Sequence, residues 1–197
     1  FVWNMAGSLC NSLSSMLLLI IVNRISGESR GGFFALAYST AQLLFSVGGF
    51  EIRPVQSTDI KNKFTFDQYF TSRMLNCIIM LICMIGYIVV NGYTGVEALT
   101  VFWILGYRMV EAVADVYSGL FQQRERIDIS GKEMLMRSGI STITFTIILW
   151  LTDNLLYAAM TLTLTSLVIM LFYDLHMKKY FEPTPVHLEW RGILGIY

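Results

Sequence analysis

The chain has 197 residues, of which 55% are hydrophobic and only 14% are charged, and its mean hydropathy is +0.58. Soluble domains carry about 25% charged residues, so a soluble chain of this composition would have too few polar side chains to cover its surface. The composition therefore excludes an ordinary soluble domain and favours a membrane protein. The 14 Lys and Arg balance the 14 Asp and Glu, so no positive field attracts nucleic acid, and we expect no nucleic-acid partner.

Six apolar stretches are long enough, or nearly so, to cross a hydrocarbon core of about 30 Å as helices. The predicted fold class is therefore all-α, a polytopic membrane protein with a bundle of six transmembrane helices. The fifth stretch is the weakest, because Arg137 stands near its start and threonines dilute it. In chain order, the predicted spans are residues 5–22, 31–50, 74–90, 98–121, 134–151 and 155–173.

The Lys and Arg residues predict the orientation of these spans. All but three of the 14 lie in or next to the second connection, the fourth connection and the tail after the sixth span. The exceptions are Arg24 and Arg30 in the first connection and Arg108 inside the fourth span. Because cytoplasmic loops are enriched in Lys and Arg, we place these three segments, and both ends of the chain, in the cytoplasm.

Two helix starts carry capping signals. Thr65 followed by Gln68 fits a capping box that opens the third helix, with Phe64 and Tyr69 as a hydrophobic staple. Asp128 is expected to cap the fifth helix in the same way. The cytoplasmic connections are therefore predicted to be ordered.

The fourth span contains three charged residues, Arg108, Glu111 and Asp115. A charge at mid-bilayer costs about 2.5–3.5 kcal/mol on insertion scales, whereas a Leu or Ile returns only about 0.3–0.6 kcal/mol. The three charges therefore cannot face lipid. Steps of three and four residues place them on one helical face, which Ser118 and Gln122 continue.

Weaker polar stripes follow the first two spans. We interpret them, together with the charged face of the fourth span, as the wall of a water-filled cavity between the three helices. The alternative is a buried Arg108–Glu111 ion pair that only holds helices together. Small residues such as Gly7 and Ala112 would allow close helix packing. The stripes consist of Asn4, Ser8, Asn11 and Ser15 in the first span, and of Tyr38, Gln42 and Ser46 in the second, continued by Arg53.

Other reactive residues point to no further chemistry. Cys10, Cys77 and Cys83 lie in apolar runs without metal-ligand spacing, and we interpret them as small buried hydrophobes. His176 and His187 lie in the tail and are expected to be solvated. With no serine elbow or zinc motif, the sequence predicts no metal, no cofactor and no enzyme.

Several segments resemble, in order, the bacterial polysaccharide flippases of the Wzx type, which transport O-antigen and capsule repeat units and belong to the MOP superfamily together with the multidrug MATE exporters. The segments are residues 49–59 (GFEIRPVQSTD), 66–73 (FDQYFTSR), 107–119 (YRMVEAVADVYSG), Gln122 and 126–132 (RIDISGK). The resemblance implies that residues 1–174 form the N-terminal six-helix lobe of a protein about twice as long. Residues 175–197 would be a cytoplasmic amphipathic tail or linker towards a second lobe.

The resemblance also implies a substrate and a location. The substrate would be an oligosaccharide repeat unit on undecaprenyl pyrophosphate, flipped across the bacterial cytoplasmic membrane during lipopolysaccharide or capsule synthesis. Membrane lipid and polysaccharide-assembly proteins would be the other partners. On this basis, Arg108, Asn11 and Gln42 would bind the substrate, and Glu111 and Asp115 would couple its transport to a proton or a sodium ion.

We assign roles in substrate attraction to three further arginines on the basis of their charge. Arg53 and Arg73 would attract the anionic headgroup at the cytoplasmic mouth of the cavity, and Arg24 at the outer mouth. The alternative for all three is positive-inside anchoring or contact with lipid headgroups.

Three other functions compete with the flippase. A multidrug or cation antiporter of the same superfamily would use the carboxylates, but Arg108 disfavours a cationic substrate. A membrane enzyme of polysaccharide assembly would be expected to carry a large outer loop, and the predicted outer loops are short. A pure scaffold would not need the charged stripe.

Overall fold

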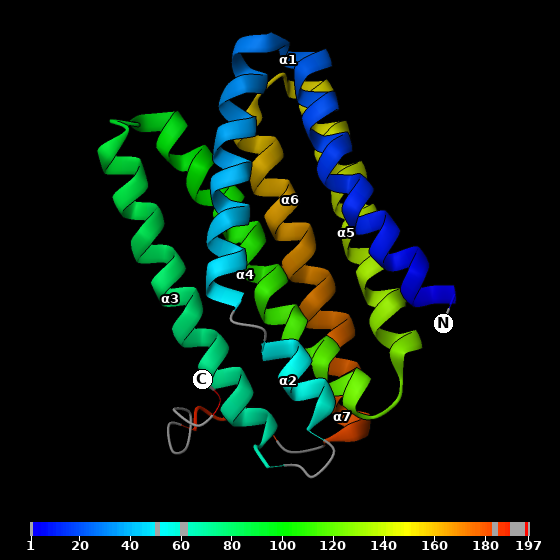
Figure 1. Ribbon diagram of the computed structural model, residues 1–197. Coiled ribbons are helices and arrows are strands. Elements are labelled where there is room, and N and C mark those ends of the chain that lie inside the picture. Colours follow the sequence, from blue (N-terminus) through cyan, green and yellow to red (C-terminus); the bar gives the residue numbers. More distant parts are fainter. Residues whose placement is uncertain (1, 50–51, 60–62, 183–184, 190–195, 197) are drawn as a thin grey trace.

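The computed structural model describes residues 2–49, 52–59, 63–182, 185–189 and 196. Every regular element within these residues is a helix, which confirms the all-α class. The long helices run alternately up and down and form one bundle (Figure 1). The elements are α1 (Val2–Gly49), α2 (Ile52–Thr58), α3 (Phe66–Val90), α4 (Gly95–Gln123), α5 (Ile127–Thr152), α6 (Leu155–Ile169), the π-helical turn η1 (Met170–Asp174) and α7 (Leu175–Phe181).

α1 is a helical hairpin with two arms (Figure 1). Gly27 has φ 84° and ψ 171°, and the chain reverses there. Glycine adopts a positive φ readily because it has no Cβ. Next to the turn, a Cβ on Gly31 would lie 1.6 Å from Asn23 Oδ1, so the two arms meet where a side chain is missing. The predicted first connection is thus one non-helical residue, and the two arms occupy the places of the first two spans; Phe50, the predicted end of the second, lies outside the described residues.

Four described helices are long and apolar enough to cross a membrane, judged by length and composition. They are Val2–Ser46, Phe66–Val90, Ile127–Thr152 and Leu155–Phe181. Large apolar side chains such as Leu9, Ile82 and Ile143 are exposed on their outer faces, as expected for a surface that contacts lipid. α4 has 29 residues but carries the three charges. The count of six spans, which needs both arms of α1 and α4, stays a prediction.

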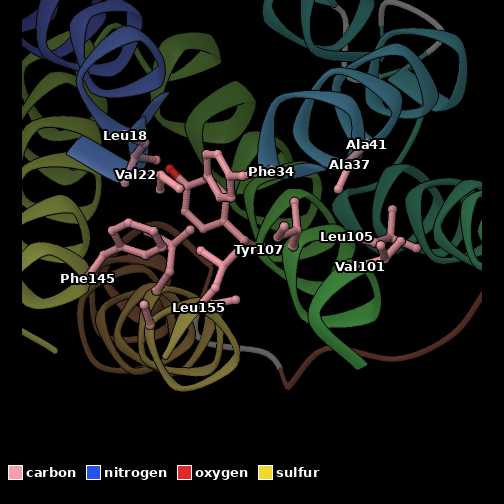
Figure 2. Close-up of a cluster of buried hydrophobic side chains, with 14 of the residues drawn as sticks. Leu18, Val22, Phe34, Ala37, Ala41, Val101, Leu105, Tyr107, Phe145 and Leu155 are labelled. Carbon is pink, nitrogen blue, oxygen red and sulfur yellow. The ribbon is translucent and has the colours of Figure 1, made fainter. Parts of the chain in front are cut away.

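The interior between α1, α4, α5 and α6 is a hydrophobic core (Figure 2). Phe34 on the second arm of α1 packs against Phe145 of α5 with ring centroids 5.7 Å apart, and Tyr107 of α4 is buried in the same cluster. A smaller cluster, which includes Ile52 and Phe121, joins α2 to α4. Because lipid is as apolar as these side chains, close packing rather than removal from water holds such a core together.

Connections that the sequence assigned to the cytoplasm gather at one end of the bundle. α2, α7 and the first turns of α3 and α5 lie there, whereas the turn of α1 and the connections α3–α4 and α5–α6 lie at the other end (Figure 1). At that other end, Arg30 Nη1 pairs with Asp153 Oδ1 at 3.0 Å. The two-ended arrangement agrees with the predicted alternation of loops. Which end faces the cytoplasm stays a prediction.

The capping box of α3 is confirmed. Thr65 Oγ1 accepts a hydrogen bond from the Gln68 backbone N–H, and Gln68 Oε1 accepts one from the Thr65 N–H at 3.0 Å. The predicted staple is also present, since the rings of Phe64 and Tyr69 lie 5.9 Å apart.

The prediction that Asp128 caps α5 is wrong. The N-cap is Arg126, without a side-chain cap, and Asp128 lies inside the first turn. There its carboxylate accepts hydrogen bonds from Arg126 at 2.8 and 3.0 Å, which takes its oxygens away from the backbone. A carboxylate in the first turn still favours the helix through the macrodipole.

The last helix continues beyond the predicted end of the sixth span at Tyr173. α6 passes through η1 into α7, so the first part of the predicted tail is helical. Further on, residues 185–189 are irregular, and Glu189 accepts a hydrogen bond from Thr65 Oγ1 at 2.8 Å. Pro183 and most of residues 190–197, on which the prediction of an amphipathic segment depends, lie outside the described residues.

α5 and the first arm of α1 touch through their backbones near Gly7 and Gly131. A Cβ on Gly7 would lie 2.4 Å from the Gly131 carbonyl oxygen, and a Cβ on Gly131 would lie 2.4 Å from the backbone nitrogen of Asn4. Helices approach this closely only where side chains are absent. The expected packing role of Gly7 is thereby confirmed.

We expect Gly131→Ala to force the two helices apart and to lower the stability by about 1–3 kcal/mol, as overpacking does. Gly139→Ala on the same helix is the matched control, because its Cβ would meet only Cys10 Sγ, at 3.8 Å. Thermal midpoints of the two purified variants in detergent test this, and equal midpoints would contradict it.

Asp59 stabilises the connection between α2 and α3 through several hydrogen bonds. Its carboxylate accepts hydrogen bonds from the backbone N–H groups of Lys63 and Phe64, at 2.9 and 3.0 Å, and from the Tyr69 hydroxyl at 3.1 Å. Its carbonyl accepts one from Gln123 Nε2 at 2.6 Å, at the end of α4. Desolvation by itself would raise the pKa of Asp59, but the backbone donors outweigh it and hold the pKa below its ordinary value.

Asp59→Asn should therefore lower the thermal midpoint at neutral pH. Because the folded-state pKa is depressed, the contribution of the carboxylate is complete above its unfolded pKa of about 3.9 and is lost as the pH falls through the folded value. We expect the gap in midpoint between wild type and variant to close below about pH 4. A gap that does not change with pH would show that the charge of Asp59 is unimportant.

Candidate functional site

A cavity of about 750 Å³ lies between the two arms of α1, with α4 contributing to its wall. Its volume is within the range of roughly 300–1,000 Å³ found for ligand pockets. The cavity lies between the same three helical segments for which the sequence predicted one. Its polar lining residues are Asn11, Ser12, Ser15, Tyr38, Ser39, Gln42, Arg108 and Glu111.

Arg108 and Glu111 form an ion pair in the wall of this cavity. Their exposed fractions are 3% and 5%, and Arg108 Nη1 bonds to Glu111 Oε2. Asn11 Nδ2, from the first arm of α1, donates to the other carboxylate oxygen of Glu111 at 3.1 Å. Tyr38, from the second arm, lies beneath the guanidinium, with its ring centroid 4.4 Å from Cζ. The pair is thus held by α1 from both sides.

Arg108 keeps donors that no described residue uses. Its Nε and Nη2 are buried and make no hydrogen bond within the described part of the chain. A buried donor without a partner costs about 1–3 kcal/mol, and an acceptor oxygen that reached either nitrogen would remove that cost. The ion pair and the cavity, which the sequence left as alternatives, are therefore both present at one place.

Asp115, one turn beyond Glu111 on α4, belongs to a different cluster. Arg53 Nη1 and Arg73 Nη2 each pair with one of its carboxylate oxygens at 3.0 Å. Arg53 also lies 3.4 Å from Gln122 Oε1. Arg73 is 1% exposed, so it does not lie open at a mouth as its predicted role requires. None of the three residues lines the cavity.

Arg24 stands apart from both groups. It is exposed near the turn of α1 and is not among the residues that line the cavity. Gln42, by contrast, reaches the cavity from the second arm, as predicted. The structure thus brings together Asn11, Gln42, Arg108 and Glu111, and leaves Arg24 outside.

A third charged group was not singled out from the sequence. Glu133 and Arg137 of α5 form a buried ion pair, and Asp174 of η1 is buried close to them. The spacing of four residues between Glu133 and Arg137 could have indicated the pair. Asp174 gives no such signal, because it reaches the pair only through the packing of η1 on α5.

Comparison of the chain with protein-family models, curated proteins and solved structures gives no match. Within the described residues, no group of three or more His, Cys, Asp or Glu side chains could hold a metal ion. The cysteines are unpaired thiols, of which Cys77 is buried, Cys10 half-buried and Cys83 exposed. The expectation of burial is therefore wrong for Cys83, which lies on the outer, apolar face of α3.

The Arg108–Glu111 pair can be measured by a double-mutant cycle. Arg108→Met and Glu111→Gln each leave one buried charge unpaired, and each should destabilise by about 3–5 kcal/mol. The double variant should lose less than the sum of the two, because neither charge remains. Unfolding free energies in mixed micelles test this, and additive losses would mean that the two groups do not interact.

Proposed function

We propose that this chain is the N-terminal lobe of a Wzx-type flippase that moves undecaprenyl-pyrophosphate-linked oligosaccharide repeat units across the bacterial cytoplasmic membrane. The lobe would have six spans, namely both arms of α1, α3, α4, α5 and α6 with its extension. The end that carries α2 and α7 would face the cytoplasm. The resemblance of residues 49–59, 66–73 and 107–119 to these flippases supports the family, and the site supports the chemistry.

One observation carries this proposal. Arg108 is buried, has two nitrogens, Nε and Nη2, that make no hydrogen bond within the described part of the chain, and lines a cavity of about 750 Å³. The helices around the cavity have apolar outer faces. A fork of guanidinium donors binds phosphate oxygens well. The lobe would thus offer a polar path inside a shell that lipid can solvate.

A sugar headgroup needs such a path. Each hydroxyl that enters hydrocarbon without a hydrogen bond costs several kcal/mol, so an oligosaccharide cannot cross unaided. Asn11, Gln42 and the serines of α1 would replace its water, while the lipid tail stays in the membrane. Alternating access would come from rocking this lobe against a second one, as in other transporters built from repeats.

Glu111, rather than Asp115, is the better candidate for ion coupling. Glu111 lines the cavity, whereas Asp115 is engaged by two arginines outside it. A proton or sodium ion that binds Glu111 would weaken its bond to Arg108 and free the guanidinium for the substrate.

A cation antiporter of the same superfamily is the second candidate. Tyr38, Phe45 and Glu111 in the cavity wall are groups that a cationic drug would contact. Arg108 in the same wall repels such a substrate, which is why we prefer the flippase.

Complementation tests the choice. The gene would be deleted from its host and resupplied intact, with Arg108→Ala, or with Arg126→Ala. The last variant removes an exposed arginine that is not among the residues lining the cavity. We expect Arg108→Ala to abolish surface polysaccharide, with the lipid-linked intermediate accumulating on the inner leaflet, and Arg126→Ala to restore it. Normal polymer after deletion, with new sensitivity to cationic drugs, would favour the antiporter.

Coupling at Glu111 has its own test. Glu111→Gln cannot exchange a proton, so the rate of polysaccharide export should lose its dependence on pH or sodium. Export should be compared in wild type and variant over a range of external pH and of sodium concentration. A dependence equal to that of wild type would exclude Glu111 as the coupling group.

A further inference from the structure

A second buried carboxylate group lies between α5 and η1, outside the cavity. Asp174 and Glu133 each have an exposed fraction of 0%. Both carboxylate oxygens of Asp174 and one oxygen of Glu133, Oε2, make no hydrogen bond within the described part of the chain. The other oxygen of Glu133 accepts from Arg137 Nε. Three acceptor atoms are therefore buried without a donor.

The charged and titratable groups near Asp174 leave this cluster negative. From α5 it faces Glu133 and Arg137, and from α4 the Tyr117 hydroxyl. On its own helix, Tyr173 is adjacent, and the ammonium of Lys178 lies over the ring of Phe66, 4.9 Å from its centroid. The charged groups that act on Asp174 are Glu133 and Arg137, and Lys178 is not among them. Asp174, Glu133 and Arg137 together therefore carry one excess negative charge when all three groups are ionised.

An excess charge in this position is costly. A buried ion without a partner destabilises strongly, and each unsatisfied acceptor adds to the cost. Binding of one positive charge would remove this cost. A proton fits better than a sodium ion. The Arg137 guanidinium, which is bonded to Glu133, would repel a metal ion, whereas protonation of one carboxylate removes the excess charge without any further ligand.

We propose that Glu133 and Asp174 form a proton-binding site that takes up one proton. The step is the addition of H⁺ from bulk water to one carboxylate oxygen, which leaves a neutral carboxyl group and no other change in bonding. The π-helical turn supports a specific role, since such turns occur frequently at functional sites. It widens the helix at the turn that ends with Asp174.

The site can also influence the cavity. Arg137 lies close enough to Glu111 for their charges to interact. When Asp174 loses its proton, Arg137 is attracted by two carboxylates in the cluster and neutralises Glu111 less. Loss of the proton would thus alter the Arg108–Glu111 pair. This coupling role rests on the function proposed above, whereas proton binding itself does not.

Infrared spectroscopy of the intact protein in lipid nanodiscs tests the binding directly. A protonated carboxyl group has a C=O stretching band that a carboxylate lacks. We expect such a band in wild type at neutral pH, its loss in Asp174→Asn, and its shift in Glu133→Gln. Glu28→Gln, which alters an exposed carboxylate at the turn of α1, should leave the band as in wild type.

Three outcomes would overturn the proton site. They are no such band in wild type, a band that survives in both Asp174→Asn and Glu133→Gln, or a carboxylate signal that responds to sodium at constant pH in wild type but not in Asp174→Asn. If one variant fails to fold, the other variant and the wild-type spectrum still decide. For the coupling role, Asp174→Asn should flatten the pH dependence of polysaccharide export. An intact infrared result with no export phenotype would remove the coupling role and leave the proton site standing.

Discussion

The ion pair between Arg108 and Glu111 is the interaction on which the arrangement of the other helices depends. Two charges near the middle of an apolar bundle have to be enclosed by protein, because lipid offers them no hydrogen bonds. α1 encloses them by reversing at Gly27, so that Asn11 of one arm and Tyr38 of the other both reach the pair. The same enclosure leaves a cavity between the arms. The need to enclose Arg108 and Glu111 in protein therefore accounts for both the ion pair and the cavity.

Three clusters of charged side chains among the described residues differ in their balance of charge. Arg108 and Glu111 cancel one another, and Asp115 is outnumbered by Arg53 and Arg73. The cluster of Glu133, Arg137 and Asp174 has one carboxylate more than it has cations. A balanced pair serves as a wall or a binding surface, whereas a fully buried excess carboxylate needs a proton or another cation. This difference separates the proposed substrate site from the proposed proton site.

The close contact of Gly7 with Gly131 sets where α5 lies relative to α1. Since α5 carries Glu133 and Arg137, this contact also sets how near that pair comes to η1 on one side and to Glu111 on the other. The contact between Gly7 and Gly131, although it involves no polar side chain, therefore influences the electrostatics at both Glu111 and Asp174. Such dependence is expected in a close-packed interior, where small shifts are transmitted rather than absorbed.

The sequence alone determined the features that depend on local pattern. The all-α class, the capping box at Thr65 and Gln68, and the inward face of α4 all follow from composition, from spacing and from the cost of charge in hydrocarbon. The predicted cap at Asp128 failed because the arginine two residues before it competes for its oxygens, a contact that propensity does not include. Only the tertiary structure decided which charges meet. Arg53, Arg73 and Asp115 come together from three helices, and Asp174 reaches Glu133 through a π-helical turn, because ion pairing depends on distance in space and residues far apart in sequence carry no local sign of it.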